Sequence, residues 1–448
     1  MFTFRKGGVH PPENKITASG KIIAVELPRE VTMAMSQHIG APAMCIVKKG
    51  DHVERGDMVG KAGGFVSANV FTPISGTVVK VDKTKNAYGM PVDSVTIAAS
   101  DEDHASDMEE RFGQSRTRGE IDTLSAEEII NIIGDAGIVG LGGAAFPTRV
   151  KLTPPPGKHA DILVINGAEC EPFLTNDHAL MLARPDELLE GVRLLMRGAD
   201  VEKAVIGIES NKRDAIDLLR TRLDSDESIK VEALKVKYPQ GGEKQLIKAL
   251  TGREVPAGGL PVDAGAIVQN VATAYAVYEA VYLGKPLIDR VVTVTGPSVT
   301  APGNYLVPIG MRMSDLVDLA GGVPADTGKV ILGGPMMGRT AVSLDCPATK
   351  GTSAILMLPE SQSSRRTVQP CIRCAGCVAA CPIGLEPYRL GLLSAQSRWD
   401  MVEASGVMNC LECGCCSFSC PSSRPLLDYI RLGKSTVGGM IRARSAKK

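Results

Sequence analysis

The sequence predicts a multidomain α/β protein that ends in a mainly helical, cysteine-rich unit. Its 448 residues are enough for several domains. Short apolar segments between glycine turns fill residues 40–100, whereas strand-like and helix-like segments alternate from Ser125 onward. Nine of the twelve cysteines lie within residues 371–420. We therefore expect four units, at residues 1–105, 122–285, 286–345 and 362–432.

Composition and charge narrow the classes of function. Hydrophobic residues make up 44% of the chain and charged residues 22%, as in ordinary soluble globular proteins. The 50 basic and 50 acidic residues cancel, so the chain has no basic footprint for a nucleic-acid partner. It has no run of roughly eighteen apolar residues, and Met1–His10 lacks the apolar core of a signal peptide. We therefore expect a cytoplasmic protein without a membrane span of its own.

The first unit shows a pattern of paired strands. The run from Val47 to Val81 contains VKKGDHVERGDMVG and SANVFTPISGTVVKV, and it resembles the hairpin of a biotinyl- or lipoyl-type barrel-sandwich domain. Carrier domains of that type have an acceptor lysine at the hairpin tip, where this chain has Ser67, Ala68 and Asn69. We therefore expect a lipoyl-like barrel-sandwich unit with a docking or structural role, rather than a covalently attached cofactor.

A helix signal opens the second unit, after a polar stretch at residues 100–121 that reads as a linker. Ser125 and Glu128 form a capping-box pattern ahead of Ile129. Buried strand-like segments then alternate with segments of helical spacing, which predicts an open, Rossmann-like α/β sheet with parallel strands. The expected strands are Ile162–Ile165, Ala204–Ile208 and Val231–Val236, and the expected helices are Glu187–Met196, Arg213–Leu223, Lys244–Leu250 and Asn270–Leu283.

The third unit is smaller. We expect strands at Val291–Thr295, Tyr305–Val307 and Val330–Leu332, and a short helix at Met313–Leu319. This arrangement resembles a β-grasp domain of the soluble-ligand-binding type. Residues 347–369 read as a connector into the cysteine-rich unit.

Two cysteine runs in the last unit share one spacing. The spacing C-x2-C-x2-C-x3-C-P is typical of two-cluster ferredoxins, in which the fourth cysteine of each run binds the other [4Fe–4S] cluster. The segment between the runs contains helix formers, which predicts a mainly helical two-cluster ferredoxin module. One expected ligand set is Cys371, Cys374, Cys377 and Cys420, and the other is Cys410, Cys413, Cys416 and Cys381.

Two other interpretations of these cysteines are weaker. Structural zinc usually takes C-x2-C pairs that are well separated in sequence, not three thiols within seven residues, twice. A disulfide framework is typical of short secreted domains. Cys415 lies outside the spacing, and we expect it to be a packed thiol rather than a ligand.

A glycine-rich segment follows the first helix of the second unit. Gly140-x-Gly142-x-x-Ala145 matches a relaxed dinucleotide fingerprint, but it follows a helix instead of a strand. The residues alone therefore leave a packing loop and a ligand-binding loop open. Closely spaced glycines let backbone N–H groups approach a phosphate or a flat ring, and Lys151 can supply charge.

The wider motif set favours a flavin site. GLGGAAFPTRVKL (140–152) resembles the flavin loop of the NADH-binding subunit of respiratory complex I, and three further motifs of that subunit are matched by residues 166–172, 238–243 and 269–273. With this domain order, the whole chain resembles the C subunit of the Rnf electron-transport complex. The chain departs from the complex I motifs at Leu141, Ala145, Ala168 and Gly242.

This resemblance implies specific roles. Gly140, Gly142, Gly143 and Lys151 would hold the phosphate and ribityl groups of FMN, and Asn166, Asn270 and Thr273 would bind the flavin. Glu169 and Glu243 would lie at the face shared by flavin and nicotinamide. The other interpretation of Glu169 and Glu171 is a solvated loop at the end of a strand.

The resemblance also implies a function. A flavin connects hydride donors, which give electrons in pairs, with iron–sulfur clusters, which accept single electrons. We expect a peripheral subunit on the cytoplasmic face of the bacterial inner membrane that passes electrons between NAD(H), FMN and two [4Fe–4S] clusters. Its complex would couple ferredoxin and NAD redox chemistry to Na⁺ or H⁺ movement. The expected partners are an iron–sulfur subunit, integral membrane subunits and ferredoxin upstream.

Two other functions stay open at this point. One is a flavin and iron–sulfur subunit of a soluble NAD-linked hydrogenase or formate dehydrogenase. The other is a relay or scaffold subunit with clusters but a non-functional flavin site.

Overall fold

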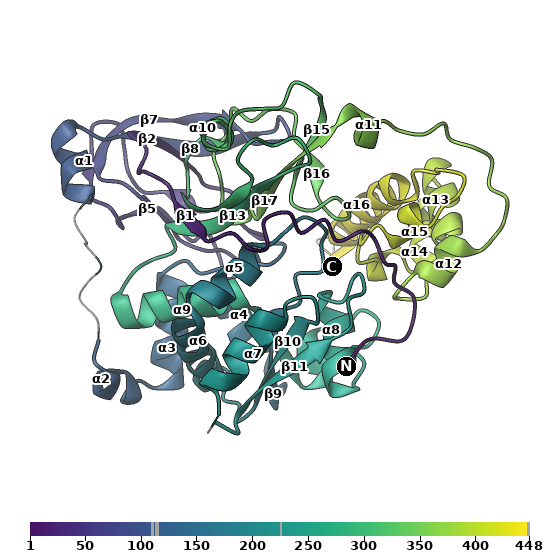
Figure 1. Ribbon diagram of the computed structural model, residues 1–448, viewed down its shortest axis with the longest axis horizontal. Helices are drawn as coiled ribbons and strands as arrows, with labels where there is room; N and C mark the ends of the chain where they lie inside the picture. Colours follow the sequence, from purple (N-terminus) through teal and green to yellow (C-terminus); the bar gives the residue numbers. More distant parts are fainter. Residues whose placement is uncertain (109–111, 113–115, 225, 446–448) are drawn as a thin grey trace.

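The computed structural model describes residues 1–108, 112, 116–224 and 226–445. Its strands form a six-stranded sheet, two four-stranded sheets and a three-stranded sheet. Figure 1 shows the N-terminal sheets and the six-stranded sheet above the parallel sheet and its helices, with the cysteine-rich helices at one end of the molecule.

The N-terminal unit consists of two small antiparallel sheets. The order β2-β8-β7-β4 forms one sheet and β3-β5-β6 the other. The tip of the predicted hairpin packs against the α/β unit, since the Asn69 side chain donates to the carbonyl of Asp135 at 3.1 Å. Its strands are β2 (Glu30–Ala34), β3 (Met44–Cys45), β4 (His52–Val53), β5 (Met58–Lys61), β6 (Val70–Phe71), β7 (Gly76–Lys85) and β8 (Pro91–Ala98).

The predicted linker at residues 100–121 is wrong in part. It contains the helix α1 (Asp101–Asp107) and the start of α2 (Arg118–Asp122). Both helices begin with a capping box, formed by Ser100 with Asp103 and by Thr117 with Glu120. The remaining part of this stretch at residues 109–111 and 113–115 lies outside the described residues.

The α/β unit contains the predicted parallel sheet, in the order β11-β10-β9-β12. Strand β12 was not predicted. The helix α3 (Ala126–Asp135) starts with the expected Ser125–Glu128 capping box. The strands are β9 (Ile162–Gly167), β10 (Ala204–Glu209), β11 (Ile229–Leu234) and β12 (Ala266–Asn270), and the other helices are α4 (Thr148–Leu152), α5 (Asn176–Ala183), α6 (Pro185–Gly198), α7 (Arg213–Arg222), α8 (Glu243–Thr251), η1 (Pro261–Ala264) and α9 (Val271–Leu283).

The six-stranded sheet extends beyond residues 286–345, in the order β1-β14-β13-β17-β15-β16. Strand β17 lies between β13 and β15 and is buried throughout, although the sequence reads there as a connector. The N-terminal strand β1 forms one edge of this sheet by pairing with β14, and β16 forms the other edge. The elements are β1 (Ile22–Ala24), β13 (Asp289–Thr295), β14 (Gly303–Pro308), α10 (Met313–Leu319), β15 (Thr327–Leu332), β16 (Arg339–Thr340), β17 (Ala354–Pro359) and α11 (Glu360–Ser363).

The cysteine-rich unit is mainly helical, as predicted. Its core is built from apolar residues such as Leu390, Val402, Leu426 and Ile430. The helices are α12 (Gly376–Ala380), α13 (Pro387–Ala395), α14 (Trp399–Ala404), η2 (Val407–Asn409), α15 (Cys415–Phe418) and α16 (Leu426–Ser445). Within the described part of the chain, no helix is both long and apolar enough to cross a membrane.

The first residues form an extended N-terminal arm, which we define as residues 2–17. Phe2 pairs with β11, and Val9 exchanges two backbone hydrogen bonds with Tyr238 of the α/β unit, at 2.8 and 2.9 Å. Gly8 donates to the carbonyl of Ala380 in the cysteine-rich unit at 2.9 Å. The arm, dark purple in Figure 1, therefore ties these two units together.

Candidate functional site

The glycine-rich loop, residues 140–146, joins α3 to α4. It closes on itself through a 2.9 Å hydrogen bond from the Gly140 amide to the carbonyl of Phe146. The Leu141 amide donates to Oγ1 of Thr273 at 3.0 Å, which fixes the loop against α9. A Cβ atom on Gly142 would lie 2.3 Å from Nδ2 of Asn270, whereas one on Gly143 would meet open space. Both glycines are exposed, and the space beside Gly143 is open to a ligand, whereas Asn270 fills the space that a Cβ atom of Gly142 would take.

Two asparagines connect this loop to the carboxyl edge of the sheet. Oδ1 of Asn270 caps α9 by accepting from the amide of Ala272 at 2.8 Å. Nδ2 of Asn270 donates to Asp177 at 2.6 Å and to the carbonyl of Asn166 at 3.4 Å. The Asn166 side chain in turn donates to the carbonyl of Gly241 at 2.9 Å. The predicted site residues Asn166 and Asn270 thus form one network with Asp177 and Gly241.

Lys151 and Glu243 form an ion pair at the same edge. Nζ of Lys151 lies 2.8 Å from Oε1 of Glu243 and donates to the carbonyl of Val268 at 3.0 Å. The two side chains are 28% and 37% exposed, so both remain accessible to a ligand.

The carboxylate of Glu169 accepts hydrogen bonds from the first turn of α5. Its two oxygens accept from the amides of Asp177 at 2.7 Å and His178 at 3.4 Å. Burial, with the charge of Glu169 nearby, raises the pKa of Asp177 to about 7. The nearby Glu171 is not a solvated loop residue, because it is partly buried and its carboxylate accepts three hydrogen bonds from Tyr238, Met336 and Met337.

Two buried cations at the loop were missed by sequence reasoning. The guanidinium of Arg290 donates to the carbonyls of Leu141, at 3.0 Å, and of Lys350. The ammonium of Lys350 donates to the carbonyls of Asn69 and Gly137. Burial lowers the pKa of Arg290 to about 10 and that of Lys350 to about 7. No local motif marks either residue, because only the tertiary fold brings them to the loop.

The residues present fit a phosphate-bearing flavin. The exposed backbone of the loop, the N-terminus of α9 and the accessible amine of Lys151 offer donors and positive charge to an anion. The side-chain oxygen and nitrogen of Gln269, the residue before Asn270, are buried without a partner among the described residues. Buried polar groups of this kind are normally satisfied by an ordered water or a bound group.

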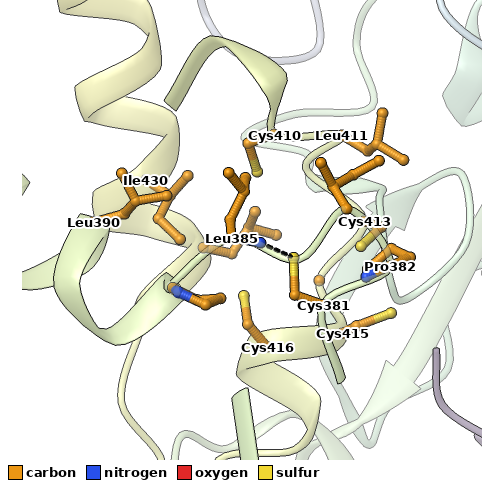
Figure 2. Close-up of a pocket in the computed structure, with 14 residues that line it drawn as sticks. Cys381, Pro382, Leu385, Leu390, Cys410, Leu411, Cys413, Cys415, Cys416 and Ile430 are labelled. Carbon is orange, nitrogen blue, oxygen red and sulfur yellow. Dashed lines mark hydrogen bonds between the residues drawn. The ribbon is translucent and has the colours of Figure 1, made fainter. Parts of the chain in front are cut away.

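The inner cysteine set, which we define as Cys381, Cys410, Cys413 and Cys416, lines one apolar pocket (Figure 2). Cys381 comes from the first run and the other three from the second. Backbone amides of Leu385 and Glu412 donate to the sulfurs of Cys381 and Cys410, both at 3.3 Å. Such N–H groups stabilise negative charge on cluster-bound thiolates.

Burial makes two of these thiols hard to ionise without a metal, whereas a hydrogen bond from Cys415 lowers the pKa of Cys413. Burial raises the pKa of Cys410 to about 11 and that of Cys416 to about 12. Among the described residues, no three histidine, cysteine or acidic side chains converge tightly enough for a single ion. A cubane cluster is larger than one ion and spreads its four ligands apart, which suits the four thiols of the inner set; Cys415 is the fifth cysteine that lines this pocket.

The outer cysteine set, defined as Cys371, Cys374, Cys377 and Cys420, lies nearer the surface. Cys371 and Cys374 are exposed, and Cys377 and Cys420 are partly buried. Ser422 joins the two runs, since its carbonyl accepts from the Gln369 amide and its hydroxyl donates to the carbonyl of Pro370, both at 2.9 Å. The four thiols of the outer set are the type of donor that an iron–sulfur cluster takes.

Cys415 lies in the contact between the cysteine-rich and α/β units. Its sulfur points away from those of Cys381 and Cys416 in Figure 2 and lies 3.9 Å from the carbonyl of Tyr238. Tyr238, Cys415, Ala380 and Val9 form one buried cluster, against which Cys170 and Cys413 pack. Because the Gly241 amide donates to Cys170 at 3.2 Å, this cluster continues into the network of Asn166.

Comparisons with known families agree with this architecture. Residues 2–102 match the RnfC barrel sandwich hybrid domain, residues 133–279 the Nuo51 FMN-binding domain and residues 291–340 the SLBB domain. The predicted barrel-sandwich and flavin units are thereby confirmed. Two chains of an NAD⁺-reducing [NiFe]-hydrogenase match at 21% and 20% identity, with TM-scores of 0.48 and 0.49, over 65% and 72% of this chain and 57% and 67% of theirs.

Curated relatives match nearly the whole chain. The C subunit of the Na⁺-translocating ferredoxin:NAD⁺ oxidoreductase complex of Acetobacterium woodii is 44% identical over 96% of both chains. The proton-translocating counterpart of Clostridium ljungdahlii is 42% identical over 96% of this chain and 93% of its own. The C subunit of the ion-translocating oxidoreductase complex of Rhodobacter capsulatus is 39% identical over 86% of this chain and 74% of its own. The predicted resemblance is confirmed, and the chain belongs to the RnfC family, the C subunits of the ion-translocating Rnf-type oxidoreductase complexes.

Proposed function

We propose that this chain is the electron-transfer subunit of a ferredoxin:NAD⁺ oxidoreductase complex that moves Na⁺ or H⁺. It would pass electrons between NAD(H), FMN and two [4Fe–4S] clusters. The names of the relatives and the match to an FMN-binding domain support this function. Bound FMN would supply the conversion between paired and single electrons.

One observation carries the proposal: the inner cysteine set packs directly against the flavin unit. Cys415 is buried in one cluster with Tyr238, and Cys413 of the inner set packs against that cluster. Tyr238 lies three residues before Gly241, whose amide donates to Cys170. Two cysteines of the outer set are instead exposed at the surface of the cysteine-rich unit. We infer that the order of sites is flavin site, inner set, outer set and partner.

The side chains would divide the work at the flavin site. Gly140, Gly142, Gly143 and Lys151 would hold the phosphate and ribityl groups of FMN. Asn166, Asn270 and Thr273 would bind the flavin, and Thr273 also fixes the loop through the Leu141 amide. Glu243, at the first turn of α8 and paired with Lys151, would face the nicotinamide side. Glu169, which was expected at the same face, would instead hold the start of α5 through the Asp177 amide. It would thereby position Asp177, whose carboxylate accepts from Asn270.

The chain would work as a peripheral subunit on the cytoplasmic face of the bacterial inner membrane. An iron–sulfur subunit and integral membrane subunits would be its neighbours, with ferredoxin upstream. We assign its units to about residues 1–105, 122–285, 286–345 and 362–432, with β1 and β17 completing the sheet of the third unit.

The test is anaerobic reconstitution of the full chain with iron, sulfide and FMN. We expect about eight iron atoms per chain, as two cubanes require. NADH alone should bleach the flavin absorbance and then the iron–sulfur absorbance. Stoichiometric zinc without charge-transfer absorption would refute the clusters, and iron-loaded, FMN-loaded protein that NADH cannot bleach would refute the electron path.

A further inference from the structure

The carboxylate of Glu171 lies where three units meet. It belongs to the flavin unit, in the loop after β9. Oε1 accepts from the Met337 amide at 2.8 Å and from the Tyr238 hydroxyl at 3.3 Å, and Oε2 accepts from the Met336 amide at 3.1 Å. Met336 and Met337 belong to the methionine loop, which we define as residues 333–338 after β15 in the six-stranded sheet.

The other side of the methionine loop contacts the second cysteine run. A Cβ atom on Gly414, between Cys413 and Cys415, would lie 2.6 Å from the carbonyl oxygen of Met336. The guanidinium of Arg431 donates to the carbonyl of Met337 at 2.9 Å and pairs with Glu412 at 3.2 Å. The loop is thus held between a flavin-unit carboxylate and the segment that carries three cysteines of the inner set.

The contact between the carboxylate and the methionine loop leaves no free space. A Cβ atom on Gly334 would lie 2.2 Å from Oε2 of Glu171. Any side chain there would push the carboxylate and the loop apart. A glycine at position 334 therefore allows the Glu171 carboxylate to lie directly against the methionine loop.

We propose that Glu171 is a positioning residue, which fixes the inner cysteine set relative to the flavin site through the methionine loop. This inference rests on the proposed function, because it assigns Glu171 a role in electron transfer between those two sites. Electron transfer slows steeply as donor and acceptor separate, so a small displacement of this joint between the units has a large effect on rate.

The chemistry of the joint requires a carboxylate. Two backbone N–H groups point at its two oxygens, and an ionised carboxylate offers only acceptors. A glutamine offers one acceptor oxygen and an NH2 group that would face an N–H donor. Glu171→Gln therefore leaves one amide of the methionine loop without a partner.

The experiment compares Glu171→Gln and Gly334→Ala with the wild type, all as the full, reconstituted chain at pH 8. Asp107→Asn is the matched control, because Asp107 is a buried carboxylate that accepts a backbone N–H from Ser75 in the N-terminal unit. Stopped-flow absorbance gives the rates of flavin and of iron–sulfur reduction by NADH. Hydrogen–deuterium exchange of residues 333–338 and 410–416 reports the joint without reference to activity.

We expect both joint variants to slow iron–sulfur reduction by about 10- to 100-fold, while flavin affinity and the rate of flavin reduction stay within about twofold of the wild type. Exchange at Met336 and Met337 should increase in both variants and stay unchanged in Asp107→Asn. Unchanged exchange and unchanged iron–sulfur reduction in both joint variants would overturn the inference. A wild type that NADH cannot reduce would instead refute the proposed function, and the exchange data would still decide whether Glu171 holds the joint.

Discussion

The inner and outer cysteine sets come from two copies of one sequence spacing, yet the fold gives them different surroundings. Cys381 and Cys416 are buried, whereas Cys371 and Cys374 are exposed. The inner pocket is closed by Leu385, Leu390, Leu411, Leu427 and Ile430. The difference comes from outside the two runs: Tyr238, the methionine loop and the N-terminal arm all contact the second run or Cys381.

The outer set lies beside an exposed segment. Residues 364–375 contain no helix or strand, and all of them are exposed. The stretch includes Arg365, Arg366 and Arg373 but no acidic residue. A buried site held by three units suits a fixed relay, whereas an exposed site beside a positively charged segment suits exchange with a partner. Repeated spacing therefore predicts two equivalent clusters, and tertiary packing makes them unequal.

Losing one ligand from each set gives the largest contrast. We expect Cys413→Ser to destroy the inner cluster and to stop NADH from reducing the outer one, because the outer set lies beyond the inner set. Cys374→Ser should damage the outer cluster alone and leave the inner one reducible by NADH. Iron content and reduced-state electron paramagnetic resonance distinguish the two results. Full NADH reduction of the remaining cluster in Cys413→Ser would reverse the proposed order of the sites.

A change in the glycine-rich loop should separate the flavin site from both sets. Gly142→Val puts a branched side chain where even a Cβ atom lies 2.3 Å from Asn270. We expect FMN affinity to fall by more than about 3 kcal/mol, the scale of overpacking plus lost donors, while iron content stays at the wild-type level. FMN fluorescence quenching measures the affinity. Retained binding and NADH reduction would show that the loop is only structural.

The N-terminal arm offers a test of what makes the inner set different. A Cβ atom on Gly7 would lie 2.5 Å from the carbonyl carbon and oxygen of Cys381, and its φ is +65°. Gly7→Val should therefore displace Cys381 and lower iron retention at the inner set, with about 1–3 kcal/mol of destabilisation from the overpacking. Gly50→Val is the control, because Gly50 has a φ of +95° but no atom within 4 Å. Equal iron loss in both variants would mean that backbone strain, not the contact with Cys381, is responsible.

The features that could be predicted from the sequence are those with a local pattern of residues. Runs of apolar residues placed β9 and β10 correctly, and the short helix α10 lies where it was expected. The two ligand sets inferred from the cysteine spacing stay a prediction, and the pocket that contains the inner set is also lined by Cys415. Short, fully buried strands lack the alternation that identifies a strand, and β10 was found because its apolar run lies between helix-like segments. Strands β12 and β17 were missed because β12 runs directly into α9 and β17 lies in a stretch that reads as a connector. Arg290, Lys350 and the joint at Glu171 have no local signature. Their roles arise from contacts between residues far apart in the chain.

The smallest expected effect concerns the charge of Glu171, and it tests whether the joint responds to pH. Burial raises the pKa of Glu171 from 4.5 to about 7, against the lowering effect of its three hydrogen-bond donors. Between these pH values the unfolded chain releases the proton and the folded chain keeps it, so this carboxyl stabilises the fold at low pH and that contribution is lost as the pH rises through about 7. Glu171→Gln has no such proton. We therefore expect the free energy of unfolding of the wild type, minus that of Glu171→Gln, to fall by about 1–3 kcal/mol between pH 5 and 8, at about 1.4 kcal/mol per pKa unit.

Urea unfolding of both proteins at several pH values measures the difference. Gly334→Ala keeps the carboxyl and so serves as the control for loosening the joint without removing the titrating group. A difference that stays flat or rises with pH would mean that the folded joint holds Glu171 as an anion throughout, stabilised by the amides of Met336 and Met337.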